Sequence, residues 1–282
     1  MFAFIGQERE RFGVARLCRL FGVTRAGFYA WQRRPLSAHA RQDRVLLDEM
    51  RVIFERSGRT YGSPRLYRAL VRRGHAVSRR RVERLMRQAQ WRARVVRVYR
   101  RTAGTHRWFA QHPNRVRAQV TTAPNQIWVG DLTYVSVAGR WWYVAVILDR
   151  HSRRLLAWRL GHTRDARFTS RLIAVALRRR RPPSGLIFHS DRGSEFLGTR
   201  FHAHLTVHGA LQSMTRGGAP DENAHMESFF HSLKAELLHG RVFTTAGDLR
   251  TQLARYARYY NQERLHSALG YQSPVDYERG AA

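Results

Sequence analysis

From residue 126 onward the chain alternates apolar segments with turn-forming residues, and the order of these segments limits the folds that it can adopt. Residues 126–136, 140–149 and 154–161 are rich in aromatic and β-branched side chains, which favours three strands. Only short turns separate them, with Ala138-Gly139 in the first turn and residues 150–152 in the second. Because short turns join strands of opposite direction, we predict an antiparallel meander.

The segments that follow mix helices with further strands. The predicted elements are a helix at 166–180, a strand at 185–190, a helix at 196–208, a strand at 211–214 and a helix at 221–238. Three antiparallel strands, a helix and a further alternation of strands and helices form the order of a ribonuclease H-like mixed sheet. We therefore predict an α/β fold with helices flanking the sheet. Residues 121–240 are assigned to this core and 241–282 to a C-terminal helical extension.

The charge of the chain is large and unevenly distributed. The 282 residues carry 51 Lys+Arg and 20 Asp+Glu, a net charge of +31, while 43% of them are hydrophobic. This combination is typical of a globular protein that binds a polyanion, and it argues against disorder. Residues 1–120 carry a net charge of +22, whereas residues 121–282 carry +9. Since phosphate neutralisation by arginine supplies affinity for any DNA sequence, we predict that the first part binds DNA.

Composition also excludes several classes of protein and site. The longest apolar run, 141–148, is too short to cross a bilayer, and the first residues lack the pattern of a secretory signal, so we expect a cytoplasmic protein without membrane contact. Cys18 is the only cysteine, which excludes an internal disulfide and multi-cysteine zinc sites. Any metal is therefore expected to have oxygen or imidazole ligands.

The basic part contains two patterns that resemble helix-turn-helix units. In residues 1–36, a helix that begins at Val14 is followed by a turn at Gly22 and by Thr24, a favourable N-cap for a second helix. This arrangement would place Arg25 at a DNA groove. A generic helical hairpin is the alternative, because short matches of this kind are common by chance.

Residues 37–100 contain the second pattern, in which Ser78 caps a helix with an apolar inner face. The outer face of this helix carries Arg79, Arg80, Arg81, Arg84 and Arg87. Such a density of positive charge repels itself unless an anion lies against it, so we predict a DNA-binding helix, with a solvated surface as the alternative. Residues 101–120 are Arg-rich and poorly periodic, which predicts a linker that also contacts phosphate.

Three carboxylates fall where the predicted elements meet. Asp131 lies inside the first strand, among apolar residues, where an ionised group is unfavourable unless a cation accompanies it. Asp191 follows the fourth strand, and Glu227 lies near the start of the last helix. If the first and fourth strands are neighbours, the carboxylates of Asp131 and Asp191 converge, and a helix packed across that edge can supply the third. Three hard oxygen donors form a site for two Mg²⁺ or Mn²⁺ ions, which activate water and stabilise a leaving 3′ oxygen.

Each acid also has an ordinary structural explanation. Asp131 alone would be a strand residue paired with arginine, Asp191 a turn former, and Glu227 a residue on a helix surface. Glu195 and Glu222 are weaker candidates for the same site. We expect Glu195 to point into the next helix and Glu222 to lie in the capping loop.

The strings around these acids are similar to those of the second-reading-frame (OrfB) transposases of the IS3 insertion-sequence family. The similar segments are residues 128–134, 189–196 and 223–234, with 61–65 upstream and 260–274 near the end. Asp191 and Glu227 are separated by 35 residues, the spacing of the Asp, Asp-35-Glu polynucleotidyl transferases. The chain departs from the family pattern at 217–220, Gly-Gly-Ala-Pro, where a Lys-Gly-Asn type of loop is common.

This resemblance implies a retroviral-integrase-like core in which Asp131, Asp191 and Glu227 are catalytic metal ligands. It also implies that Lys234, two helical turns after Glu227 and on the same face, contacts the end of the donor DNA. The expected activity is metal-dependent cleavage and strand transfer at the terminal inverted repeats of an element. A ribonuclease H-like nuclease without strand transfer and a non-catalytic DNA-binding repressor are the alternatives.

The resemblance also implies the partners of the chain. They are the double-stranded DNA of the element ends, the target DNA and, since two ends must be held, further copies of the chain in a homo-oligomer. Members of the family are often active as a fusion with an upstream first-reading-frame product. The expected setting is a bacterial cytoplasm, where DNA binding associates the protein with the nucleoid.

Overall fold

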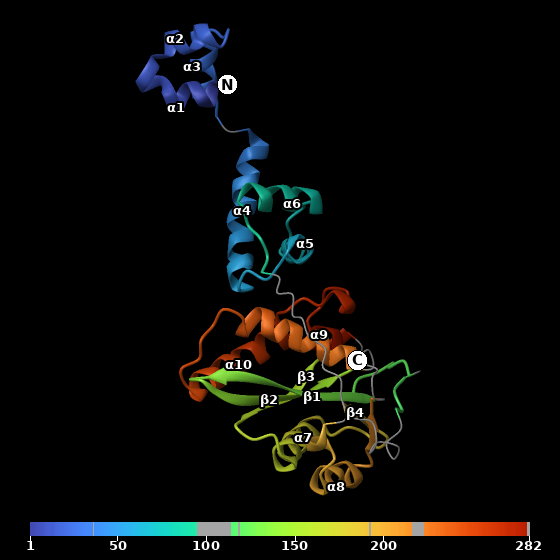
Figure 1. The fold of residues 1–282 in the computed structure, drawn as a ribbon. Coiled ribbons are helices and arrows are strands. Elements are labelled where there is room, and N and C mark those ends of the chain that lie inside the picture. The colour runs from blue at the N-terminus through green and yellow to red at the C-terminus, as the bar shows by residue number, and fades with distance from the viewer. Residues whose placement is uncertain (36, 95–113, 118, 192, 216–222, 281–282) are drawn as a thin grey trace. The chain divides into compact units, whose positions relative to one another are not determined.

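The computed structural model describes residues 1–35, 37–94, 114–117, 119–191, 193–215 and 223–280 (Figure 1). The chain divides into two compact units, residues 1–53 and 54–282, and the boundary falls within helix α4 (Ala38–Arg56). The first unit also contains α1 (Phe2–Phe12), α2 (Val14–Leu20) and α3 (Arg25–Arg33). The Thr24 hydroxyl accepts a hydrogen bond of 3.0 Å from the Gly27 N–H, which caps α3 as the sequence predicted.

The helices of the first unit enclose a small core of their own. Its buried members are Ile5, Leu17, Cys18 and Phe28. Cys18 is therefore a packing residue. Gly22, with φ 64°, forms the turn between α2 and α3, because a left-handed backbone favours glycine.

The second unit begins with the helices that carry the predicted basic surface, α5 (Ser63–Arg72) and α6 (Arg79–Gln88). Ser78 caps α6 by accepting a hydrogen bond of 3.2 Å from the Arg81 N–H. Val82 and Leu85 are fully buried on the inner side of α6. The predicted linker lies largely outside the described residues, which omit 95–113 and 118.

The core of the second unit is a five-stranded mixed sheet in the order β3-β2-β1-β4-β5. Its strands are β1 (Ile127–Val137), β2 (Arg140–Asp149), β3 (Leu155–Gly161), β4 (Ile187–Ser190) and β5 (Leu211–Met214). The first three form the predicted antiparallel meander, while β4 runs parallel to both β1 and β5. The fourth strand is therefore the neighbour of the first, which was the condition for the carboxylates to converge.

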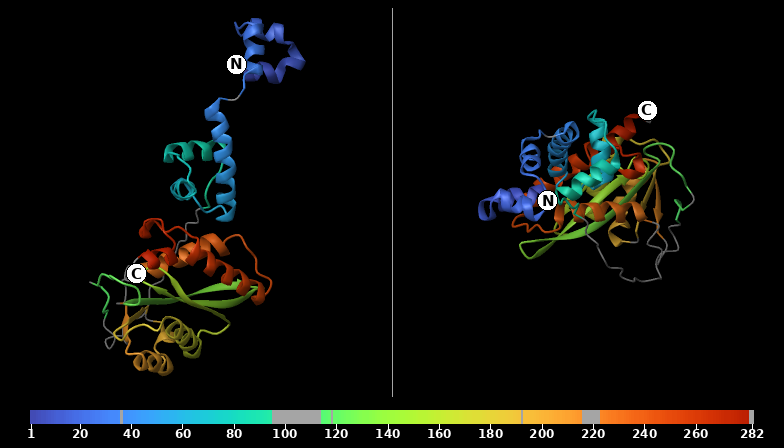
Figure 2. Two further views of the ribbon diagram at one scale, coloured as in Figure 1. Left: turned by 180° about the vertical axis from the view of Figure 1, so that it is seen from behind. Right: turned by 90° about the horizontal axis from the view of Figure 1, so that it is seen from above.

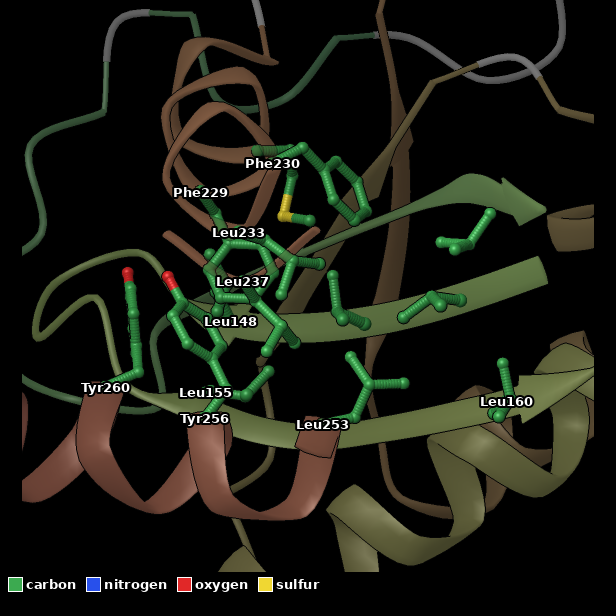
Figure 3. Packing of buried hydrophobic residues seen from close by; sticks show 14 of the residues in the cluster. Leu148, Leu155, Leu160, Phe229, Phe230, Leu233, Leu237, Leu253, Tyr256 and Tyr260 are labelled. Atoms are coloured by element: carbon green, nitrogen blue, oxygen red, sulfur yellow. The ribbon is translucent and has the colours of Figure 1, made fainter. Parts of the chain in front are cut away.

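Helices cover both faces of this sheet (Figures 1 and 2). They are α7 (Ala166–Arg180) and α8 (Thr199–Val207) on one face, and α9 (Ala224–Leu233), its π-helical continuation η3 (Lys234–Leu238) and α10 (Ala246–Gln262) on the other. Val129 of β1 packs into the cluster with Leu233 and Leu253, whereas Trp128 packs into the cluster with Phe168. Figure 3 shows the first cluster, where α9 and α10 meet the sheet.

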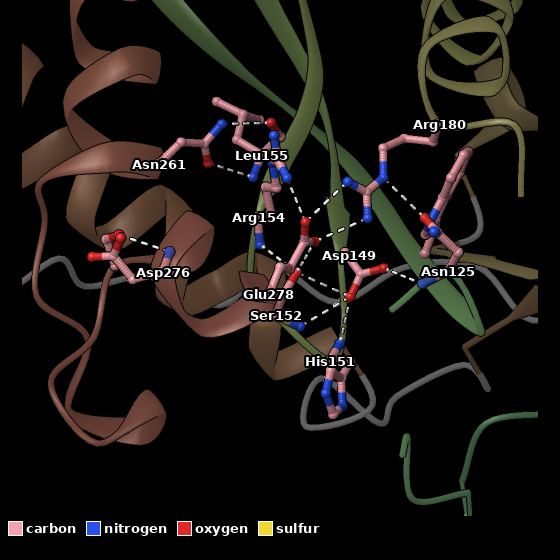
Figure 4. A network of polar contacts seen from close by, with 12 residues as sticks. Asn125, Asp149, His151, Ser152, Arg154, Leu155, Arg180, Asn261, Asp276 and Glu278 are labelled. Carbon is pink, nitrogen blue, oxygen red and sulfur yellow. Dashed lines mark hydrogen bonds and ion pairs between the residues drawn. The ribbon is translucent and has the colours of Figure 1, made fainter. Parts of the chain in front are cut away.

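A polar network fixes the end of the chain to the core (Figure 4). Helix α11 (Pro274–Gly280) follows the short 3₁₀ helix η4 (Ser267–Leu269) and carries Glu278. The Glu278 carboxylate accepts hydrogen bonds from Arg180, at 2.9 and 3.0 Å, from Arg154, and from Ser152 at 2.7 Å. These donors hold the pKa of Glu278 below its usual value, although burial alone would raise that pKa.

The predicted elements and the observed ones differ mainly at their ends. The predicted helix at 196–208 is α8 preceded by the 3₁₀ turn η1 (Ser194–Phe196), and the predicted last helix changes from α to π geometry at Lys234. None of the helices in the described parts of the chain has the length and apolar character of a membrane span.

Candidate active site

The pairing of β1 with β4 brings the first two predicted acids together. In this parallel pair Gly130 lies opposite Ser190. Asp131 is the next residue of β1 and Asp191 directly follows the end of β4, so the two carboxylates lie at the same level of the sheet. A Cβ at Gly130 would lie 2.5 Å from the Phe188 ring, so glycine leaves room for this ring of β4 to lie against β1.

The electrostatics of this Asp pair favour a positively charged ligand. Burial raises the pKa of Asp131 well above its usual value, and the Asp191 charge raises it further. The Leu132 N–H, which donates to Asp131 Oδ1 at 2.7 Å, partly offsets the rise. The pKa of Asp191 is also raised by burial, and the Gly193 N–H lowers it through a 3.1 Å hydrogen bond to Oδ1.

Glu195 lies closer to the Asp pair than the sequence suggested. The expectation that it points into the next helix is wrong, because its carboxylate turns back over Gly193, where a Cβ would lie 2.7 Å from the carboxylate carbon. Glu195 is 7% exposed, and its charge contributes to the raised pKa of Asp131. The tight turn through Gly193 and η1 produces this placement. Such a turn cannot be predicted from the spacing of apolar residues in the sequence.

The third predicted acid is not part of the group. Glu227 lies in the first turn of α9 and is exposed. Among the described residues, no three His, Cys, Asp or Glu side chains lie close enough together to hold a metal ion. Residues 216–222, which precede α9, lie outside the described residues, and so do the predicted loop at 217–220 and Glu222.

Lys234 brings a positive charge to the site. Its positive charge lowers the pKa of Asp131, in opposition to burial. Lys234 begins the π-helical turn that follows α9, and single π-helical turns often occur at functional sites. Helix α9 thus presents Glu227 and Lys234 on one side, with Lys234 toward the Asp pair.

The arginines predicted to bind DNA lie on helices α3 and α6. Arg25 is the first residue of α3 and is exposed. On α6, Arg79, Arg80, Arg84 and Arg87 are exposed and Arg81 is half-buried. Arg79 forms an ion pair of 2.9 Å with Glu83, which reduces the net charge of this surface. Contact of these arginines with DNA stays a prediction.

Comparison with known proteins assigns the family. Models of an integrase core domain match residues 121–220 and 208–274, and a model of an HTH-like domain matches 40–99. The chain is 32% identical over 281 residues to the transposase InsF of insertion sequence IS3A from Escherichia coli, covering 98% of each chain. It is also 35% identical over 263 residues to an uncharacterized 31 kDa protein of insertion element IS600 from Shigella sonnei, covering 93% of this chain and 97% of the other.

The chain belongs to the IS3 family of insertion-sequence transposases. The resemblance that the sequence indicated is thereby confirmed, and the mixed sheet with the integrase-core and HTH-like matches confirms the predicted fold class.

Two solved structures are also similar to this transposase, but they cover less of the chain and have lower sequence identity. The catalytic core of HTLV-2 integrase, in complex with magnesium, is 17% identical and covers 55% of this chain and 97% of the other, with a TM-score of 0.41. A simian T-cell lymphotropic virus intasome, in complex with a PP2A regulatory subunit, is 12% identical and covers 77% of this chain and 70% of the other, with a TM-score of 0.48.

Proposed function

We propose that this transposase cleaves DNA at the ends of its element and transfers the 3′ ends to target DNA, with Asp131, Asp191 and Glu227 as its catalytic residues. The observation that carries the proposal is the Asp pair, in which burial raises the pKa of both carboxyl groups and the Asp191 charge raises that of Asp131 further. Within the described residues, neither aspartate forms an ion pair with an arginine or lysine, and Lys234 is the cation that lowers the pKa of Asp131.

The residues of the Asp pair fit a divalent cation. Carboxylate oxygens are the ligands that Mg²⁺ and Mn²⁺ prefer, and mutual repulsion in a buried position is relieved by a cation. Asp131 and Asp191 would bind the metal, and Glu227 would join them after a movement of the first turn of α9. When bound, two ions would lower the pKa of a water molecule and stabilise the charge on the leaving 3′ oxygen.

The remaining parts of the chain would hold the DNA. Lys234 lies beside Asp131 and would contact a phosphate at the end of the donor strand. The basic helices α3 and α6 would bind the terminal inverted repeats, with Arg25 and the α6 arginines at the DNA. Two element ends require at least two copies of the chain, and a first-reading-frame product would be a further partner. The reaction would take place in the cytoplasm, where bacterial DNA lies.

A joining assay tests the catalytic assignment. The substrate is a labelled duplex that carries the inverted repeat flanking the gene, incubated with target plasmid and Mg²⁺. We expect Asp131→Asn, Asp191→Asn and Glu227→Gln to lower joining by roughly a thousandfold or more, because each removes a metal ligand. Asp248→Asn, in the exposed first turn of α10, is the matched control and should join like the wild type.

The same assay separates the alternatives. Cleavage without joined product would identify a nuclease, and joining that survives Glu227→Gln would remove Glu227 from the catalytic set. Lys234→Ala should weaken binding to element ends while random-sequence duplex binds as before. Unchanged end binding and joining would contradict the role proposed for Lys234.

A further inference from the structure

A cavity of about 110 Å³ lies on the other side of α9 from the Asp pair. His225, Ser228 and Ser232 of α9 line it, together with the end of β2, the β2–β3 turn and the segment after α10. Asp149, which lines the cavity, pairs with Trp128, whereas Val146 pairs with Asp131. The cavity and the Asp pair are thus about 10 Å apart along the sheet. We propose that this cavity is a second ligand site, which binds a phosphate group.

The cavity is built from the two sequence motifs that the Asp pair leaves without a role. These are residues 61–65 and 260–274. The Tyr61 hydroxyl accepts a hydrogen bond of 2.9 Å from the Leu265 N–H, which joins the motifs. Arg65 from the first motif and Arg264 from the second then line the same cavity.

Three arginines line the cavity, and their positive charge exceeds the negative charge around them. Arg264 is fixed by Glu236, with hydrogen bonds of 2.8 to 3.0 Å to both carboxylate oxygens, and by Ser232 at 2.9 Å. Arg65 lies 3.9 Å from the same carboxylate, and burial and the Arg264 charge lower its pKa. Within the described part of the chain, Arg153 has no carboxylate partner.

The one carboxylate in the lining is already engaged. Asp149 accepts hydrogen bonds from the backbone N–H groups of Asn125, His151 and Ser152, at 2.6 to 2.9 Å, and so stabilises the β2–β3 turn. Among the described residues it forms no ion pair with Arg153, and the three arginines outnumber the two carboxylates, Asp149 and Glu236. An anion in the cavity would be met by Arg153 and Arg65 together.

Neutral hydrogen-bonding groups complete the lining. Burial and the nearby arginines lower the pKa of His266 to about 2, so its imidazole is neutral at neutral pH, and His225 lines the cavity beside it. Ser228 and Ser267 are exposed, which opens the cavity to solvent. Arginine guanidinium, hydroxyl and imidazole N–H groups are together the donors that a phosphate group requires.

The backbone conformation of Arg153 is one that other residues adopt more readily. Arg153 has φ 59°, in the left-handed region that glycine and asparagine adopt most readily. Arginine at this position therefore supplies a positive charge but does not stabilise the backbone conformation. Since one water occupies roughly 10–15 Å³ of such space, the cavity has room for a single phosphate group. Its source is either a free phosphate ion or a phosphate of the DNA backbone.

The first experiment uses inorganic phosphate as the probe. Thermal unfolding of the full chain is followed as phosphate replaces chloride at constant ionic strength. The variants are Arg153→Asn, which suits the left-handed backbone, Arg153→Lys, which keeps the charge, and Arg200→Asn, an exposed control at the start of α8. Phosphate also stabilises proteins without binding, and the control measures that contribution.

We expect a saturable rise of the unfolding midpoint in the wild type and in Arg200→Asn, a smaller one in Arg153→Lys, and none in Arg153→Asn. An equal saturable rise in Arg153→Asn would overturn the proposal. The result is independent of the proposed catalytic residues, because Asp131, Asp191 and Glu227 do not line the cavity.

The second experiment identifies the source of the phosphate group. Binding of each variant to an element-end duplex is measured at several salt concentrations. If the DNA backbone supplies the group, Arg153→Asn lowers the slope of log affinity against log salt by about 0.9, the value for one phosphate contact. If Arg153→Asn leaves this slope unchanged but loses the phosphate-induced shift of the unfolding midpoint, the ligand of the site is free phosphate.

Discussion

The two sides of α9 concentrate charge of opposite sign. Toward β1, Asp131 and Asp191 lie together, and burial and repulsion raise the pKa of Asp131. On the cavity side, burial and the nearby arginines lower the pKa of His225. The physical cause is the same in both places, since each side gathers like charges in a partly dry environment. Each side is thereby prepared for a ligand of the opposite charge, a metal cation on one and a phosphate group on the other.

The difference between the two sides lies in how much of the opposing charge the protein itself provides. Among the described residues, Lys234 supplies the positive charge that acts on Asp131. In the cavity, Glu236 fully engages Arg264 and partly offsets Arg65. The cavity side is therefore the more stable structure without a ligand, and the Asp pair gains more from its ligand.

Removing the internal counter-charge of the cavity gives the largest expected loss of stability. Glu236→Gln would leave Arg264 buried without its anion, so the free energy of unfolding should fall by about 3 kcal/mol in urea denaturation. Phosphate should then stabilise this variant more than the wild type. Glu55→Gln, which removes an exposed ion pair with Arg59, is the control and should unfold like the wild type. Equal losses in the two variants would contradict the importance of the buried pair.

The pH dependence of stability should have opposite signs on the two sides. The unfolded chain protonates His225 near its usual pKa of 6.5, whereas the folded chain does so only near 4. Stability from His225 is therefore complete above pH 6.5 and falls by at most about 3 kcal/mol as the pH drops toward 4. Asp131 acts in the opposite sense, because its raised pKa makes stability fall as the pH rises through that pKa.

Urea denaturation across this pH window separates the two contributions. His225→Gln should flatten the loss of stability on acidification, and Asp131→Asn should steepen it. Identical pH profiles for the wild type and both variants would show that neither group is perturbed in the folded chain.

A smaller loss of stability is expected from a substitution at Gly130, where β1 packs closely against β4 next to the Asp pair. Gly130→Ala would force a Cβ against the Phe188 ring and should lower the free energy of unfolding by about 2 kcal/mol. Joining should fall as well, because Asp131 shifts relative to Asp191. Gly6→Ala, where no atom lies within 4 Å of the new Cβ, is the control for the general effect of alanine. Equal stability of both variants would mean that β1 and β4 tolerate separation.

Much of the fold was predictable because the elements have strong local signals. The meander, the fourth strand and the caps at Thr24 and Ser78 follow from alternation, apolar periodicity and short polar side chains at helix starts. The Asp pair was predicted on the condition that β1 and β4 are neighbours, and the observed sheet order meets that condition.

The unpredicted features are long-range or depend on single turns. Glu195 reaches the Asp pair through the turn at Gly193, and the cavity forms where residues 61–65 meet 260–274. Periodicity reports which face of an element is apolar and carries no information on which distant loops meet. Both motifs were visible in the sequence, but only the three-dimensional contacts indicate a shared role for them.

The most direct test of the account measures Mg²⁺ binding to the Asp pair without relying on activity. Thermal unfolding of the wild type and of Asp131→Asn is compared in a metal-free buffer and in Mg²⁺. Asp131→Asn should be more stable than the wild type without metal, since repulsion is removed, and Mg²⁺ should raise the midpoint of the wild type alone. An equal rise in both proteins, or a variant that is less stable without metal, would contradict the claim that the Asp pair is prepared for a cation.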